Sequence, residues 1–113
     1  MIYLGCPYTH IDRQVELRRT ALANQATAIL MKAGLTVFSP ISNSTGLINA
    51  GVMREGFNWV AWDLLMLKEC DLMIVLMLDG WEESKGLKAE IECAKEHGIP
   101  IKYDTIDSLT TTV

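Results

Sequence analysis

Residues 71–78 read Asp-Leu-Met-Ile-Val-Leu-Met-Leu, and the rest of this 113-residue chain can be interpreted outward from them. Seven apolar side chains follow Asp71 without interruption, and Asp79-Gly80 ends the run. A run of this kind is typical of a parallel strand that is buried on both faces. It is far too short to span a bilayer. We therefore predict that it forms an inner strand of a parallel sheet and that the chain does not enter a membrane.

Helix and strand patterns alternate on both sides of this run. Further strands are predicted over residues 1–5, 35–38 and 99–103, and helices over 13–33, 57–70 and 84–97. Asp12 is the expected N-cap of the first helix, Gly34 its C-cap, and Gly98 the stop of the last helix. Residues 41–56 are rich in Asn, Ser and Gly and are expected to form a mobile loop with room for one short helix. The tail from Asp104 is weakly patterned and is expected to fray.

This order of elements predicts a single α/β domain over residues 1–113. We expect a small doubly wound sheet, flavodoxin-like or Rossmann-like, with four to five parallel strands and helices on both faces. Ligands of such folds bind outside the carboxyl ends of the strands. In this chain that edge comprises residues 5–10, 39–44 and 79–84.

Composition and charge argue against a nucleic-acid polymer, a secreted protein and a metal site. The net charge is −4, and the basic residues are scattered apart from Arg13, Arg18 and Arg19. A nucleic-acid polymer is therefore an unlikely partner, whereas one phosphate of a mononucleotide needs only a few donors. No signal peptide is recognisable. The three cysteines, Cys6, Cys70 and Cys93, lack metal-ligand spacing, so we expect reduced thiols and no bound metal. Reduced thiols are typical of a cytoplasmic protein. No cofactor is expected.

Two acidic residues lie off the solvated faces of their predicted helices. At 100° per residue, Asp63 points nearly opposite to the arc of Asn58, Lys68 and Glu69, and Glu90 lies at the edge of an apolar stripe. A poorly hydrated carboxylate is costly and has a raised pKa. One such acid is best explained by a structural ion pair or by hydrogen bonds accepted from the backbone, but two on consecutive helices around one strand favour a site. A carboxylate pair can divide acid and nucleophile duties at a glycosidic centre.

The loop before the last predicted helix is a second candidate ligand contact. Ser84 is a good N-cap, and a helix N-terminus offers free N–H groups to an anion. Gly86 would let a ligand approach the first turn closely. An ordinary capped helix explains the same residues, so this motif alone is weak.

Three segments together resemble the nucleoside 2-deoxyribosyltransferase superfamily, which includes 2′-deoxynucleoside 5′-monophosphate N-glycosidases. They are Ile2-Tyr3-Leu4-Gly5, Asp63 eight residues before Asp71, and Ser84-x-Gly86-x-x-x-Glu90-Ile91-x-x-Ala94. Cys6-Pro7-Tyr8 and Gly80-Trp81 are similar to a bacterial and phage branch that forms a domain-of-unknown-function family. Two departures concern phosphate handling: Glu92 stands where the superfamily often has Gly, and no Gly-rich loop follows the first strand.

The resemblance implies a role for each matching residue. Glu90 would attack C1′ of the sugar, Asp63 would protonate or steer the departing base, and Tyr3 would orient Glu90. Ser84 would contact the 5′ end, and a serine there favours a 5′-monophosphate over a free nucleoside. The remaining candidate substrate contacts are Gly5, Tyr8, Asn43, Trp59 and Gly86.

The predicted function is therefore hydrolysis or transfer at the N-glycosidic bond of a (deoxy)nucleoside 5′-monophosphate. One alternative is a non-catalytic nucleotide-binding or sensor domain of the same fold. Another is an interaction protein with Trp62 and residues 41–56 at its interface. Trp59 could stack on a base, although core packing explains it equally well. A homodimer or larger homo-oligomer is expected, with Trp62 as a contact.

Overall fold

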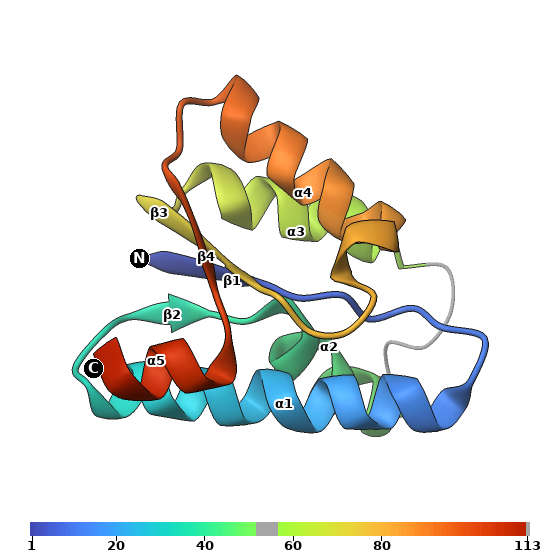
Figure 1. Cartoon of the computed structure of the whole chain (residues 1–113). Helices are drawn as coiled ribbons and strands as arrows, with labels where there is room; N and C mark the ends of the chain where they lie inside the picture. Colours follow the sequence, from blue (N-terminus) through green and yellow to red (C-terminus); the bar gives the residue numbers. More distant parts are fainter. Residues whose placement is uncertain (52–56, 113) are drawn as a thin grey trace.

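A four-stranded parallel sheet forms the centre of the computed structural model, which describes residues 1–51 and 57–112 (Figure 1). Its strands lie in the order β2-β1-β3-β4. All three pairings are parallel, and Tyr3 of β1 is in register with Met73 of β3. The predicted doubly wound α/β fold is confirmed. The bounds are β1 (Ile2–Gly5), β2 (Val37–Phe38), β3 (Leu72–Leu76) and β4 (Ile101–Asp104).

Helices cover both faces of the sheet. In Figure 1, α1 (Arg13–Lys32), α2 (Pro40–Asn49) and α5 (Ile106–Thr112) lie on one face. On the other face lie α3 (Trp59–Lys68) and α4 (Lys85–Glu96), the latter preceded by the 3-10 turn η1 (Trp81–Glu83). None of the helices in the described ranges is both long and apolar enough to cross a membrane.

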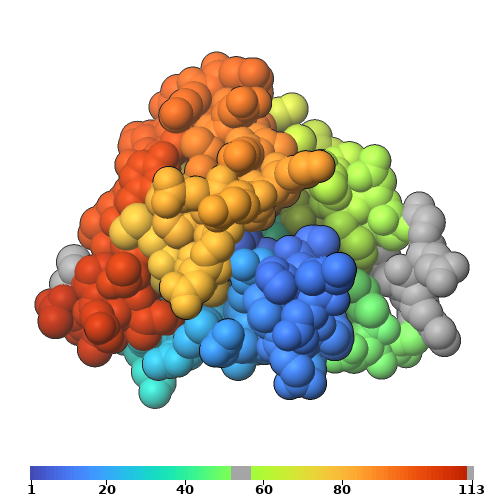
Figure 2. Space-filling view, turned by 45° about the vertical axis from the view of Figure 1, so that its right-hand side comes forward, coloured from blue at the N-terminus to red at the C-terminus, as the bar shows by residue number. Residues whose placement is uncertain are grey.

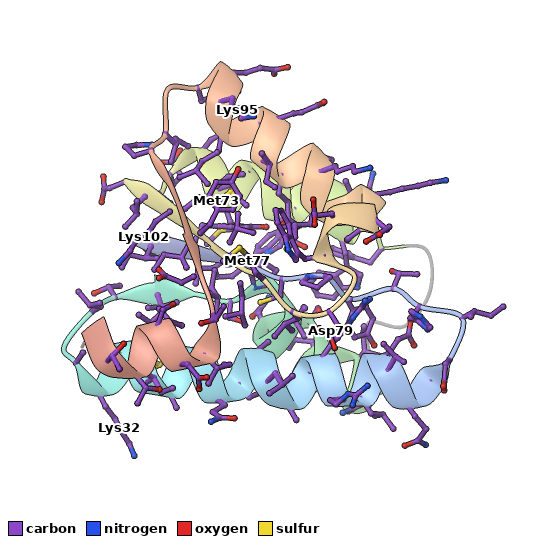
Figure 3. All side chains as sticks on the ribbon, in the orientation of Figure 1. Lys32, Met73, Met77, Asp79, Lys95 and Lys102 are labelled. Atoms are coloured by element: carbon purple, nitrogen blue, oxygen red, sulfur yellow. The ribbon has the colours of Figure 1, made fainter. Side chains whose placement is uncertain are left out.

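Alternation along the inner strands divides the core into two layers. In β1, Leu4 faces the side of α1, whereas Tyr3 faces the side of α3 and α4. Met73 of β3 lies on the same side as Tyr3, between the sheet and the upper helices in Figure 3. Because successive side chains of a strand point to opposite faces, an uninterrupted apolar run supplies both layers.

Local hydrogen bonds set the helix ends where the sequence predicts them. Asp12 Oδ1 accepts from the Gln14 N–H at 2.9 Å, and Ser84 Oγ accepts from the Leu87 N–H at 3.2 Å. The C-cap is Ala33, one residue earlier than the predicted Gly34, and Gly34 follows it directly with φ 89°. Its left-handed conformation favours glycine, which explains why α1 ends at this point.

The second strand is shorter than predicted, and the segment after it contains the one short helix for which the prediction left room. β2 covers only two residues, and the segment predicted as a loop begins with the ten-residue helix α2. Ser39 caps this helix, its Oγ accepting from the Ser42 N–H at 3.4 Å, and Pro40 occupies the first turn. The prediction took Ser39-Pro40 as the end of a strand. The same pair is also typical of a helix start, with serine as the N-cap and proline in the first turn. The rest of the predicted mobile loop, residues 52–56, lies outside the described residues.

The predicted fraying of the tail is wrong, because the tail forms α5. Leu109 is 1% exposed and belongs to the core layer on the side of α1. Thr105 and Ser108 cap the helix reciprocally: the Ser108 N–H donates to Thr105 Oγ1 at 3.0 Å and the Thr105 N–H to Ser108 Oγ at 2.7 Å. One buried leucine and one capping pair therefore hold a segment whose pattern is weak.

Candidate active site

A cavity of about 510 Å³ lies beyond the carboxyl ends of the strands, near β1. The strand order reverses at this point, since the chain passes from β1 to β2 on one side and later to β3 on the other. Figure 2 shows the surface hollowed where the blue loop after β1, the orange start of α4 and the yellow-green α3 meet. The lining consists of Cys6, Tyr8, Thr9, Pro40, Ile41, Ser44, Ile48, Trp59, Val60, Asp63, residues 83–87 and Glu90.

Asp63 and Glu90 line this same cavity from neighbouring helices. One oxygen of each carboxyl, Asp63 Oδ1 and Glu90 Oε1, is buried and has no hydrogen-bond partner within the described ranges. The Tyr3 hydroxyl and the Trp59 indole N–H are in the same state. Buried polar groups are nearly always paired. Three of these groups, on Asp63, Glu90 and Trp59, line the cavity and therefore mark it as a place where a polar ligand would supply the partners.

Burial and charge raise the pKa of Glu90 to about 8. Loss of hydration is the main cause, since a buried carboxyl group favours its neutral form. The negative charge of Asp63 raises the pKa further, and interaction with the Tyr3 hydroxyl lowers it. Although the contact between Tyr3 and Glu90 is not a regular hydrogen bond, the hydroxyl is close enough to favour the ionised form of Glu90.

The other titratable groups around Glu90 are perturbed in the same way. Burial raises the pKa of Asp63 to about 6. Burial and then the charge of Glu90 raise the pKa of both Tyr3 and Cys6. Tyr3 therefore remains a neutral hydroxyl and Cys6 a neutral thiol at physiological pH. No group of three His, Cys, Asp and Glu side chains suited to a metal ion occurs in the part of the chain that the structure describes.

Gly5 lies directly beneath Glu90 at the end of β1. A Cβ atom at this position would be 3.3 Å from Glu90 Oε1, 3.0 Å from Leu87 Cδ1 and 2.6 Å from Met73 Cε. The absence of a side chain therefore lets α4 approach the strand closely enough to bring Glu90 over it.

We expect Gly5→Ala to displace the side chains of Met73, Leu87 and Glu90 and to lower the free energy of unfolding by roughly 1–3 kcal/mol. Urea unfolding measures the stability, and a crystal structure of the variant locates the carboxyl group. Gly86→Ala is the matched control, because a Cβ at position 86 meets no atom within 4 Å. Equal stability of the two variants would contradict this account.

Some of the other predicted substrate-binding residues line the cavity and others do not. Ser84, Gly86, Tyr8 and Trp59 line it, with the Ser84 hydroxyl also capping α4. The Tyr8 hydroxyl accepts from Arg13 Nη1 at 2.9 Å. Trp59 packs edge-on against Phe57 with 4.6 Å between ring centroids. Tyr3 and Gly5 lie below the cavity and contact it through Glu90. The lining includes Ser44 but not Asn43.

Sequence reasoning missed the wall that α2 contributes. Ile41, Ser44 and Ile48 follow one face of that helix at spacings of three and four residues and line the cavity. The helical spacing was present in the sequence, but the Asn, Ser and Gly content of the segment indicated a loop. Recognition of Ser39 as an N-cap would have identified the helix and its inward face.

A second cavity of about 510 Å³ adjoins the first. The two cavities share the residues Thr9, Glu83 and Ser84. Its other lining residues are His10, Val15, Arg18, Arg19, Asp79 and Gly80. The loop after β1 and the loop after β3 therefore form a wall between two adjacent hollows.

Comparisons with known proteins agree with this architecture. The family model for a domain of unknown function, DUF1937, matches residues 1–104. The fold is similar to that of a 2-deoxyribosyltransferase from Bacillus psychrosaccharolyticus, with a TM-score of 0.67 and 23% sequence identity over 92% of this chain and 71% of that chain. A search of curated proteins finds no match. The predicted likeness to the deoxyribosyltransferases is thereby confirmed for the fold, and the predicted domain-of-unknown-function branch is confirmed as well.

Proposed function

This chain belongs to the DUF1937 family, and on that premise we propose that it cleaves or transfers at the N-glycosidic bond of a (deoxy)nucleoside 5′-monophosphate. One observation carries the proposal: Asp63 and Glu90 line a single cavity, and each has a buried oxygen with no hydrogen-bond partner in the described residues. The likeness of the fold to a deoxyribosyltransferase supports the same chemistry.

In the proposed reaction Glu90 is the nucleophile. Its carboxylate attacks C1′ of the sugar, the C1′–N bond breaks, and the bonding electron pair leaves with the base. Asp63 protonates or hydrogen-bonds the departing nitrogen. Water in hydrolysis, or an N–H nitrogen of a second base in transfer, then attacks C1′ and gives its proton to the ionised Asp63. The C1′–O bond breaks, and Glu90 is released as the carboxylate. Ser84, the N-cap of α4, is assigned to the 5′-phosphate in this proposal, because the N–H groups at a helix start favour an anion.

The acid pair has the right number of protons for this chemistry near neutral pH. With pKa values of about 6 for Asp63 and about 8 for Glu90, the two groups together hold one proton between these values. Burial and the charge of Asp63 favour the neutral form of Glu90 in the ligand-free protein. The proposed roles require an ionised Glu90 and a protonated Asp63 once the substrate is bound. The Tyr3 hydroxyl assists, because it favours the ionised form of Glu90.

Release of free base is the direct test of this proposal. We expect the protein to liberate base from at least one of the 2′-deoxynucleoside or ribonucleoside 5′-monophosphates, as measured by chromatography. Addition of a second base distinguishes transfer from hydrolysis. Matched nucleosides without phosphate test the role assigned to Ser84, and we expect them to react at least about 10-fold more slowly, because they lack the anion at the helix N-terminus. No release from any substrate, or full activity of Glu90→Ala, would rule the proposal out.

A second candidate is nucleotide binding without chemistry. Its support is the burial of Glu90, which favours the neutral form of this group, since a neutral carboxyl group is a hydrogen-bond donor and a poor nucleophile. Calorimetry followed by chromatography separates the two candidates. A nucleotide that binds and is recovered intact after prolonged incubation would favour the binding protein.

We also propose that a second copy of the chain closes the cavity. Three apolar side chains of α3 are more than two-fifths exposed: Val60, Trp62 and Leu65. Val60 also lines the cavity, as does the exposed Ile48 of α2. Exposed apolar side chains on α3, one of them at the mouth of a polar cavity, fit a homodimer interface. Light scattering on wild type and Trp62→Glu tests this, with a monomeric variant as the expected result.

A further inference from the structure

Arg19 of α1 is a buried charge in an unusual environment. It is 6% exposed, although a guanidinium group is rarely buried unless it is paired. No acidic side chain pairs with it among the described residues, and its Nε has no hydrogen-bond partner there. Its partners are backbone carbonyl groups instead. Arg19 is therefore placed to hold backbone rather than to neutralise a charge.

These carbonyl groups belong to two loops that are far apart in the sequence. Arg19 Nη1 donates to the carbonyl oxygens of Tyr8 and Thr9, each at 3.2 Å, in the loop after β1. Arg19 Nη2 donates to the carbonyl oxygen of Asp79 at 2.8 Å, in the loop after β3. In Figure 3, Asp79 lies in the loop above α1. One planar side chain therefore joins the two loops from below.

Gly80 supplies independent evidence for the same contact. Its φ is 81°, and a Cβ atom there would lie 2.7 Å from Arg19 Nη2. Any other residue would be strained in this conformation and would also displace the guanidinium group. The loop after β3 is thus shaped to admit Arg19.

The two joined loops form one wall of the candidate active site. Tyr8 and Thr9 line the cavity of Asp63 and Glu90, and residues 83–84, reached from Gly80 through η1, line it as well. Arg19 itself lines the adjoining cavity and not that of the acids. Its effect on the site must therefore pass through the loops.

We propose that Arg19 is a positioning residue for the reaction proposed above, holding the wall that carries Tyr8, Thr9 and Ser84 at a fixed distance from Glu90 and Asp63. This inference rests on the proposed function for its kinetic consequences only. A lysine cannot replace Arg19, because its ammonium nitrogen is one compact donor group. The planar guanidinium carries two separate nitrogens that donate to carbonyl groups in two directions. A loosened wall weakens substrate binding more than it slows the bound substrate.

The test compares the same substitution at two neighbouring positions, Arg19→Lys and Arg18→Lys. Arg18 is exposed and makes no hydrogen bond or ion pair with its side chain among the described residues, and both substitutions keep the charge. We expect Arg19→Lys to raise KM at least about 10-fold with kcat changed less than about threefold. Arg18→Lys should change neither by more than about twofold. Added guanidinium ion should restore part of the lost kcat/KM in Arg19→Ala, whereas methylammonium should not.

Hydrogen exchange gives a readout that needs no substrate. We expect faster exchange in Arg19→Lys at residues 5–12 and 77–84, with α3 unchanged as an internal reference. Inactivity of the wild type would overturn the proposed function. Hydrogen exchange in Arg19→Lys would still test whether Arg19 holds the two loops. Wild-type kcat/KM and wild-type exchange in Arg19→Lys would overturn the inference. So would unfolding of both Arg19 variants without recovery in guanidinium ion, because Arg19 would then be a residue of general stability.

Discussion

Replacing Glu90 by Gln is expected to lower kcat for base release by at least about 1,000-fold, with nucleotide affinity changed by less than about threefold. The amide has nearly the same shape as the acid but cannot attack C1′. Glu90 lies partly buried over Gly5, so an isosteric replacement leaves the packing of α4 against β1 intact. Steady-state kinetics and calorimetry with the same nucleotide measure the two quantities.

Glu92→Gln is the matched control for this variant. It makes the same chemical change two residues later on α4, at an exposed position away from the cavity. We expect wild-type kinetics for it. A similar loss of kcat in both variants, or a loss of binding equal to the loss of kcat in Glu90→Gln, would contradict the role of Glu90 as nucleophile.

The same Glu90→Gln substitution is expected to stabilise the fold above pH 7 and to flatten its pH dependence. The pKa of Glu90 is about 8 in the folded chain and 4.5 in a free side chain, so between these values the folded state holds a proton that the unfolded state has released. Stability from this group is therefore complete below about pH 4.5 and is lost as the pH rises through about 8. The slope is at most about 1.4 kcal/mol per pH unit.

Asp63 contributes to the pH dependence with the same sign in a lower window. Its pKa is raised from 3.8 to about 6, so its share of the stability disappears as the pH rises through about 6. Urea unfolding of wild type and Glu90→Gln at intervals from pH 5 to pH 9 separates the two windows. Their difference in free energy should grow with pH up to about 8 and then level off. Parallel curves would show that Glu90 is solvated in the folded protein.

The inward direction of Asp63 and Glu90 could be predicted from the sequence because it is a local property. The angle between side chains on one helix depends only on residue spacing, and both helices form where their caps and apolar periodicity place them. The inner strand was predictable for the same reason, since the run after Asp71 has no polar face to expose.

Other parts of the site depended on contacts between distant segments. Whether α2 supplies a wall, and whether α5 docks rather than frays, is decided by how Ile41 and Leu109 pack against a core built mainly from other segments. Neither short helix carries a strong intrinsic preference, so tertiary packing stabilises both. A fragment of sequence contains no information about the surface that will bury its few apolar residues.

The chain's own pattern of residues therefore determined the alternation of strands and helices, the buried inner strand, and the two acids turned away from water. Only the folded molecule decided that these acids open into one cavity, that Gly5 admits Glu90 above β1, and that Arg19 joins the loops after β1 and β3. The physical reason is range. Periodicity and capping act over a few residues, whereas hydration, pKa and the contacts of a buried guanidinium depend on groups that are distant in the sequence, such as Arg19 and Asp79, 60 positions apart.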